Sequence, residues 1–323
     1  MTATLDKINQ HIEKHSQFVP RLFEDMGKVI VGQTAVLERL VIALLSGGHV
    51  LLEGVPGLAK TLSVETLAKS IQAEYKRIQF TPDLLPSDLV GSLIYEQSKG
   101  DFVPKLGPIF ANFVLADEIN RAPAKVQSAL LEAMQEAQVT LGEKSYPLPK
   151  PFMVLATQNP LEQEGTYPLP EAQLDRFLMK VIIDYPSRDE EKTIMERMTG
   201  NALPALSPTV TLDAIVAAKQ ALVHIYVDDK VKNYILDLVA ATRNPNDAGL
   251  GQLAPLIEAG ASPRASLALL EAARAHAFIR GRGFVIPEDI KAIAKDVLRH
   301  RLVLSFEAEA EEKSADDIID TIL

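Results

Sequence analysis

The spacing of apolar residues changes near residue 200, and the change separates two kinds of architecture. Before that point, short and almost wholly apolar runs alternate with stretches of helical spacing. Such runs, separated by helices, are typical of the buried strands of a parallel sheet. We therefore predict an α/β domain over residues 1–200, with a parallel five-stranded sheet between helices. The predicted strands are 49–53, 75–80, 113–116, 153–157 and 178–183, and the predicted helices are 6–27, 33–46, 62–71, 124–137 and 171–175.

Two segments interrupt the alternation of strands and helices. Residues 82–110 are rich in proline, glycine and aspartate, and we predict a hairpin around Ser98–Asp101. Residues 138–150 form a second predicted hairpin, which turns at Gly142 between two alternating arms. Both segments are predicted to be insertions in the α/β domain.

The remainder of the chain is helical in pattern. Residues 199–208 contain glycine, asparagine, serine and two prolines and are predicted to be a linker. Ser262 and Pro287 are start signals for two of the helices that follow. Residues 201–323 are thus predicted to form a small all-α domain, and its acidic stretch 307–317 is expected to be a solvated or frayed end. The predicted helices are 211–222, 228–243, 264–280 and 287–298.

Composition then excludes several kinds of chemistry. Hydrophobic residues make up 47% of the chain, which is enough apolar material for a sizeable core. The formal net charge is −10, so the chain lacks an overall basic surface, and nucleic acid is an unlikely partner on this ground. The cysteine count is zero, which rules out disulfides, thiolate catalysis and cysteine-ligated zinc.

The sequence also bears on where the protein resides. No apolar run approaches the roughly 18 residues that a membrane helix needs. Residues 1–14 are polar and charged, without the apolar core of a signal peptide. We therefore expect a cytoplasmic protein without a membrane segment.

A glycine-bearing turn joins the first predicted strand of the sheet to a helix. In this context the backbone N–H groups point at a phosphate, a lysine reaches the β- and γ-phosphates, and a hydroxyl ligates Mg²⁺. The alternative is a structural turn that happens to end in Lys-Thr, because alanine stands where the usual pattern has its second glycine. The turn comprises Gly54, Val55, Pro56, Gly57, Leu58, Ala59, Lys60 and Thr61.

Polar residues follow two further predicted strands. Asp117 and Glu118 come directly after the run 113–116, and Asn159 follows the run 153–157. The carboxyl ends of parallel strands form one edge of a sheet, where ligands bind in such folds. There Asp117 would hold Mg²⁺ through water, and Glu118 would polarise the attacking water. Taken singly, the carboxylates could cap the next helix and Asn159 could form a turn.

Two arginines lie at element boundaries. Arg176 separates a helix from the last predicted strand, where it could form a local salt bridge or reach the γ-phosphate of a neighbouring subunit. Arg264 begins a helix of the second domain. The helix dipole disfavours a cation at that end, which suggests an anionic partner, although a nearby carboxylate would serve equally well.

The order of these motifs resembles that of the AAA+ ATPase superfamily and, within it, the MoxR family of ATPases. The resemblance runs from about Val31 to Leu304, and an alanine at position 59 is usual in that family. The motifs that carry it are Gly-Val-Pro-Gly-Leu-Ala-Lys-Thr (54–61), Ala-Asp-Glu-Ile-Asn-Arg (116–121), Ala-Thr-Gln-Asn-Pro (156–160), Leu-Asp-Arg-Phe (174–177) and Ser-Pro-Arg (262–264).

The resemblance implies a role for each motif residue. Lys60 and Thr61 form the Walker A pair, Asp117 and Glu118 form Walker B, and Asn159 is sensor 1. Thr61 and Asp117 are the implied ligands of Mg²⁺. ATP would be bound by the whole turn and by Leu62, which follows it.

The resemblance also assigns the remaining candidates. Val31 and Gly32 would line the adenine pocket, Arg176 would be the arginine finger, and Arg264 would be sensor 2. Whether Arg264 acts within its own subunit or on the neighbour stays open. Segment 82–110 resembles the helix-2 insert and 138–150 the pre-sensor-1 hairpin.

The resemblance implies Mg²⁺-dependent ATP hydrolysis. It also implies a ring-shaped oligomer, a hexamer in this family, which remodels or matures partner proteins. Such clients commonly contain von Willebrand factor A domains, and some receive a metal or cofactor. The alternatives are a nucleic-acid motor and an ATP-dependent transcriptional regulator. Lysines in both predicted hairpins would favour a motor, but acidic residues offset them, and we find no helix-turn-helix beyond the predicted lid.

Overall fold

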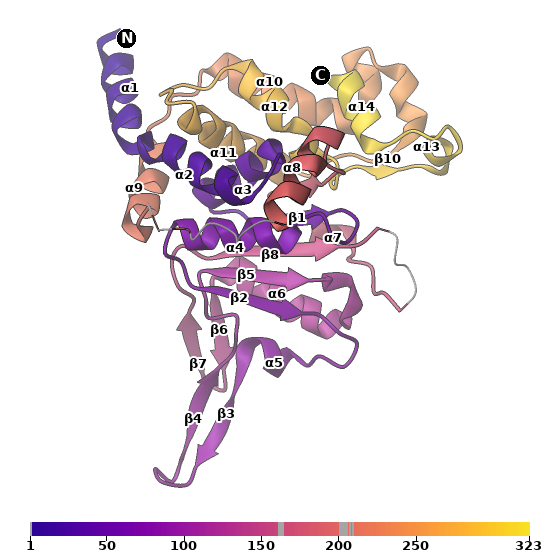
Figure 1. Cartoon of the computed structure of the whole chain (residues 1–323). Helices are drawn as coiled ribbons and strands as arrows, with labels where there is room; N and C mark the ends of the chain where they lie inside the picture. The colour runs from indigo at the N-terminus through magenta and orange to yellow at the C-terminus, as the bar shows by residue number, and fades with distance from the viewer. Residues whose placement is uncertain (1, 161–164, 200–205, 207, 209) are drawn as a thin grey trace.

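A computed structural model shows a parallel sheet with helices on both faces and a helical layer at one side (Figure 1). It describes residues 2–160, 165–199, 206, 208 and 210–323. The five central strands are all parallel, in the order β2-β5-β8-β1-β9, which confirms the predicted sheet. They are β1 (Val50–Glu53), β2 (Tyr75–Gln79), β5 (Phe113–Asp117), β8 (Met153–Gln158) and β9 (Met179–Ile182).

The sheet separates two apolar cores. On β5, Phe113 and Leu115 point into one core and Val114 and Ala116 into the other, because successive side chains of a strand face opposite sides. One core is covered by α2 (Phe18–Val29), α3 (Thr34–Ser46) and α4 (Lys60–Ser70), and the other by α5 (Pro86–Val90) and α6 (Ala124–Glu136). Both faces of the central strands β1, β5 and β8 are therefore buried, which explains why these strands are almost wholly apolar, whereas the edge strand β2 exposes polar residues.

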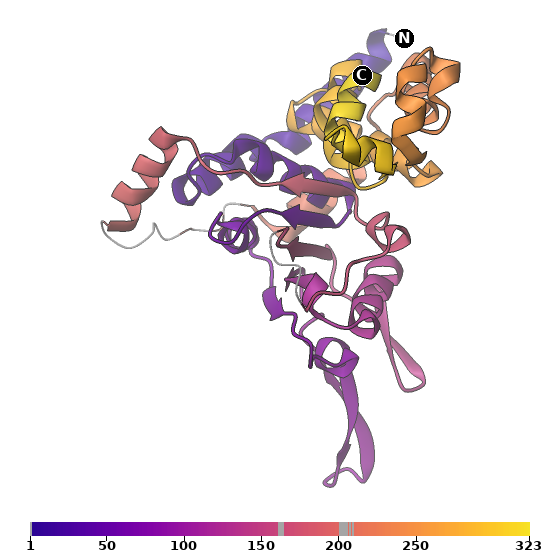
Figure 2. The same ribbon diagram turned by 90° about the vertical axis from the view of Figure 1, so that its right-hand side faces the viewer.

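Both predicted hairpins are present. The first consists of β3 (Gly91–Glu96) and β4 (Asp101–Leu106), and the second of β6 (Gln138–Leu141) and β7 (Lys144–Pro147). They extend in the same direction, away from the helical layer, and β3–β4 reaches farther than any other part of the drawn chain (Figures 1 and 2).

The four predicted C-terminal helices are α9 (Leu212–Leu222), α10 (Asp229–Arg243), α11 (Pro263–Ile279) and α12 (Pro287–Leu298). The Ser262 hydroxyl accepts a hydrogen bond from the Arg264 backbone N–H and so caps α11. Smaller elements complete this part: η2 (Pro245–Ala248), η3 (Gly251–Leu256), β10 (Ile257–Ala259), β11 (Val303–Leu304), α13 (Phe306–Ala310) and α14 (Ala315–Ile322).

The acidic end of the chain is solvated but not frayed. Most of its charged residues are exposed, yet a capping box of Ser314 and Asp317 starts α14, and Ile318 and Ile319 of that helix are buried. Burial of Ile318 and Ile319 therefore stabilises a helix that the acidic composition of the stretch did not predict.

The beginning of the chain also differs from the prediction. The pattern over 6–27 is divided between α1 (Thr2–Ser16) and α2, and α1 packs against α9 and α11. The sequence pattern also missed α8 (Arg188–Thr199), while α7 (Glu171–Leu174) and η1 (Ile119–Arg121) are short. Most of the predicted linker lies outside the described residues, so the domain boundary near residue 200 stays a prediction. Within the described residues, no helix is long and apolar enough to span a membrane.

Candidate functional site

A polar cavity of about 410 Å³ lies at the carboxyl edge of the sheet. Strands β1, β5 and β8 end there side by side, so residues about 60 and 100 positions apart in sequence come together. The cavity holds most of the predicted nucleotide residues. Its lining is Pro56, Gly57, Ala59, Lys60, Thr61, Leu62, Arg77, Asp117, Glu118, Thr157 and Asn159.

The turn between β1 and α4 has the backbone of a phosphate-binding loop. Ala59 adopts a left-handed conformation (φ 57°, ψ 22°), which is why glycine is usual there; an alanine pays about 1 kcal/mol. Gly54 is required for space, because a Cβ there would lie 2.8 Å from the Ile183 carbonyl oxygen. The loop thus delivers the first N–H groups of α4 to the cavity, where they would face an anion.

Lys60 begins α4 and is partly buried in this cavity. Its Nζ donates hydrogen bonds to the carbonyl oxygens of Gly54 and Val55. Burial lowers the pKa of Lys60, and the nearby carboxylates of Asp117, Glu118 and Glu53 oppose that shift. A phosphate would supply a stronger counter-charge than the two carbonyl groups do.

The carboxylates of Asp117, the last residue of β5, and of Glu118, which follows it, are held by side chains of the neighbouring strands. Thr157 on β8 donates a hydrogen bond to Asp117 Oδ1 (2.6 Å) and accepts one from the Glu118 backbone N–H (2.8 Å). Glu118 has a left-handed backbone (φ 56°, ψ 52°) and ends the strand at the cavity. On β2, Gln79 donates to Glu118 Oε2 (2.9 Å), and Arg77 forms an ion pair with Asp117 (2.6 Å).

Three residues of the site were not predicted from the sequence: Arg77, Gln79 and Thr157. Arg77 and Gln79 are two positions apart on β2, so both point to the same side of the edge strand. Polar residues alternating on a strand are a recognisable signal, but their proximity to Asp117 depends on the pairing of β2 with β5.

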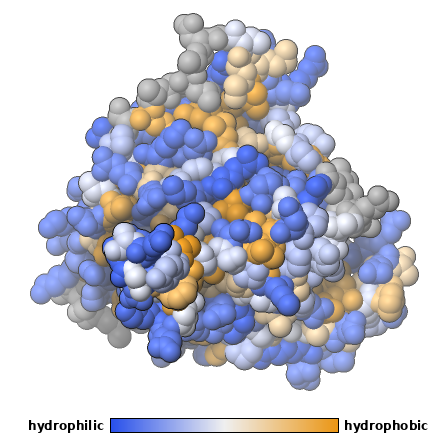
Figure 3. Space-filling model, turned by 90° about the horizontal axis from the view of Figure 1, so that it is seen from below, coloured by the Kyte–Doolittle hydropathy of each residue, from blue (hydrophilic) through white to orange (hydrophobic). Residues whose placement is uncertain are grey.

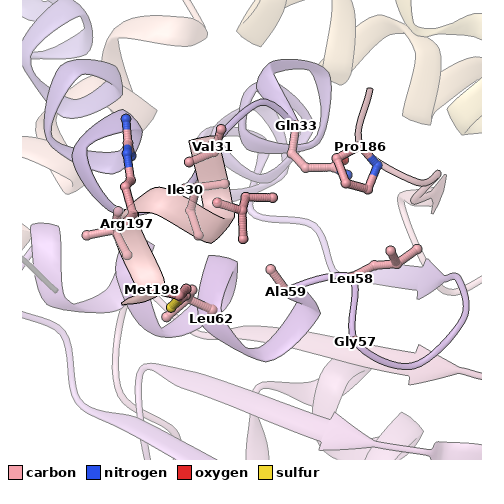
Figure 4. A pocket seen from close by; sticks show the side chains of 12 residues that line it. Ile30, Val31, Gln33, Gly57, Leu58, Ala59, Leu62, Pro186, Arg197 and Met198 are labelled. Atoms are coloured by element: carbon pink, nitrogen blue, oxygen red, sulfur yellow. The ribbon is translucent and has the colours of Figure 1, made fainter. Parts of the chain in front are cut away.

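A second, mostly apolar cavity of about 140 Å³ adjoins the loop (Figure 4). Val31, a predicted adenine-pocket residue, lies in its wall together with Leu58, Ala59 and Leu62. Gly32 is not among its lining residues. The wall that the sequence did not reveal is α8, which contributes Ile194, Arg197 and Met198. The other lining residues are Val29, Ile30, Gln33, Gly57 and Pro186.

Arg176 and Arg264 lie together, but not at the polar cavity. They line a separate hollow of about 230 Å³ with His49 and Asp175, among others. Arg264 Nη1 is 3.8 Å from Asp175 Oδ2. Arg176 precedes β9 and His49 precedes β1, so this hollow is at the amino edge of the sheet, opposite to the loop.

The donors in the polar cavity fit Mg²⁺. Thr61 offers a hydroxyl and Asp117 a carboxylate, which are the hard oxygen ligands that Mg²⁺ prefers. The described residues contain no group of three or more acidic or histidine side chains able to hold a metal alone. Mg²⁺ is usually held by one or two carboxylates together with substrate phosphates.

This parallel sheet, loop and helical layer define an AAA+ ATPase. Residues 49–179 match the family model "ATPase family associated with various cellular activities (AAA)", and residues 253–322 match the "AAA lid domain". The chain is 49% identical to "Chaperone MoxR1" of Mycobacterium tuberculosis over 94% of its length and 80% of the relative's. It is 33% identical to "Protein MoxR" of Paracoccus denitrificans, with 86% of each chain covered.

A crystal structure of a putative ATPase from Cytophaga hutchinsonii has the same fold. The TM-score is 0.92 at 50% identity, and the match covers 98% of this chain and 97% of the other. The chain belongs to the MoxR family of AAA+ ATPases.

Proposed function

We propose that this ATPase hydrolyses ATP in a Mg²⁺-dependent reaction at the polar cavity. The observation that carries the proposal is that Lys60, Thr61, Asp117, Glu118 and Asn159 converge there from three separate strand ends. Phosphoryl transfer requires mainly positioning and charge stabilisation, and this set of donors and carboxylates offers both.

Each residue has one proposed part in the reaction. Thr61 and Asp117 would hold Mg²⁺, which neutralises charge on the phosphates. Lys60 stabilises the β- and γ-phosphates, and Glu118 orients the attacking water. The amide of Asn159 lies at the end of β8, where it can contact both the γ-phosphate and that water. The turn 54–61 binds the phosphates, while Val31 and Leu62 of the apolar cavity belong to the adenine side of the ATP site. Gly32 follows Val31 and stays a proposed adenine-side residue, although it does not line the cavity itself.

The arginines support a site shared between subunits. Arg176 and Arg264 lie at the sheet edge opposite to the loop, so they are placed for the nucleotide of a neighbouring copy. On this proposal Arg176 is the finger and Arg264 also acts on the neighbour. A closed ring of six copies gives every site an arginine pair.

Light scattering on the purified chain tests the ring. With a non-hydrolysable ATP analogue and Mg²⁺ we expect a species of six protomer masses, because the nucleotide bridges the two edges. A monomer under all nucleotide conditions would contradict the shared site.

The proposed cellular role is chaperone-like remodelling of client proteins. One relative carries the name chaperone, and von Willebrand factor A domain proteins, including ones that receive a metal or cofactor, are the proposed clients. We place this activity in the cytoplasm. Residues 1–200 and 201–323 would move against each other during turnover.

The long hairpin supports a protein client. Its cross-strand pair Tyr95 and Phe102 is exposed at 59% and 61%, and the rings pack edge to face at 5.5 Å. Leu93 and Leu106 are also exposed on the same side of the ribbon. Hydrophobic residues thus lie among hydrophilic ones on the projecting hairpin (Figure 3). Lys99 pairs with Glu96 (2.7 Å), which leaves little charge for a polyanion.

We expect the double change Tyr95→Ser and Phe102→Ser to leave basal ATP hydrolysis within about twofold, because surface changes away from a site have small effects. Stimulation of hydrolysis by a client should be lost, since the apolar contact is removed. Lys99→Ser at the tip is the matched control. Salt-sensitive binding of labelled DNA that survives the double change would instead favour the nucleic-acid motor or the transcriptional regulator.

A further inference from the structure

Arg77 forms an ion pair with Asp117, the carboxylate that is proposed to hold Mg²⁺. Its Nε and Nη2 both donate to Asp117 Oδ2, at 2.9 and 2.6 Å. Asp117 Oδ1 already accepts the Thr157 hydroxyl at 2.6 Å. Both oxygens of this carboxylate therefore have donors from the protein, and one of these donors carries a full positive charge.

The two partners of this ion pair differ in freedom. The Arg77 side chain is 51% exposed, whereas that of Asp117 is 12% exposed. Asp117 is fixed by its strand and by Thr157, while Arg77 extends from the edge strand and can swing into solvent. The arginine is thus the partner that yields when a cation approaches.

A second contact links the arginine to the other carboxylate. Arg77 Nη2 donates to Gln79 Oε1 (3.1 Å), and Gln79 Nε2 donates to Glu118 Oε2 (2.9 Å). Movement of Arg77 away from Asp117 would remove a donor from Gln79, which holds Glu118 together with Arg121, whose Nε lies 3.0 Å from Glu118 Oε2. The position of Arg77 is therefore coupled to both carboxylates of the proposed site.

We propose that Arg77 is a positioning residue that competes with Mg²⁺ for Asp117. In the nucleotide-free chain it serves as the counter-ion of the carboxylate, and it leaves when the metal and nucleotide bind. This inference rests on the proposed metal role of Asp117. The Arg77 guanidinium at Asp117 raises the free Mg²⁺ concentration needed for binding, because it and the metal ion are both positive and repel each other at the same carboxylate.

The test is a magnesium titration followed by the fluorescence of a non-hydrolysable ATP analogue on the full chain. For Arg77→Met we expect the free Mg²⁺ at half-saturation to fall by about threefold to tenfold, the range for a half-exposed ion pair. Arg77→Lys keeps the charge with a single donor group and should give a smaller fall. Lys76→Met, on the opposite side of the same strand, removes a charge and should change nothing.

The possible results distinguish failure of the competition between Arg77 and Mg²⁺ from failure of the proposed metal site. An unchanged or higher magnesium midpoint in Arg77→Met overturns the competition, even if the variant is less stable on heating. If Arg77→Met does not fold, an unchanged midpoint in Arg77→Lys overturns it in the same way. A wild-type chain that binds the analogue equally with and without Mg²⁺ overturns the proposed metal site itself.

Discussion

Glu118→Gln is expected to lower the ATP turnover rate by about 10²- to 10⁴-fold, the range for loss of a general base. Glutamine has the shape of glutamate, so the left-handed backbone at this position and the strand β5 should persist. The amide cannot accept a proton from water, although it can still form hydrogen bonds with neighbours such as Gln79. Nucleotide affinity should therefore stay close to that of the wild type.

Paired measurements of turnover and of nucleotide binding test this role. Glu132→Gln, on the exposed side of α6, removes a carboxylate of the same kind outside the cavity and should be silent. Wild-type turnover in Glu118→Gln would show that another group orients the water. Loss of binding and turnover together would instead assign Glu118 to the architecture of the loop. The expected variant also holds ATP, so it would retain clients for identification.

Arg176→Ala is expected to lower turnover by about 10³-fold or more, the effect of removing an arginine finger. The guanidinium lies at the amino edge of the sheet, so the loss should fall on the neighbour's site and leave the chain's own nucleotide affinity intact. A small effect on turnover would show that Arg176 has only a structural role in the local group of charged residues around Asp175.

A mixing experiment makes the shared site measurable. Lys60→Ala lacks the phosphate side of the site and Arg176→Ala lacks the arginine side, so each alone should be nearly inactive. In mixed rings some sites combine an intact loop with an intact arginine, and activity should reappear. A site contained within one chain predicts no recovery on mixing. Arg21→Ala mixed with Lys60→Ala is the control for dilution of inactive subunits.

The sequence predicted the sheet well because its central strands β1, β5 and β8 are buried on both faces. Runs such as 113–116 are apolar without interruption, and no other arrangement of short strands and helices buries them so completely. The helix α8 was missed since none of its described side chains is buried and charged residues dominate its sequence. The division between α1 and α2 was missed because both helices continue one periodic pattern across Gln17.

The sequence by itself determined the class of site, because a loop, two carboxylates and an amide each follow a strand whose direction is implied by a parallel sheet. Only the tertiary structure decided which side chains meet. Strand pairing brings Arg77 to Asp117, and α8 closes the apolar cavity. The opposite edges of the sheet separate Lys60 from Arg176. Such proximities depend on strand order and packing between distant segments, which local sequence patterns do not record.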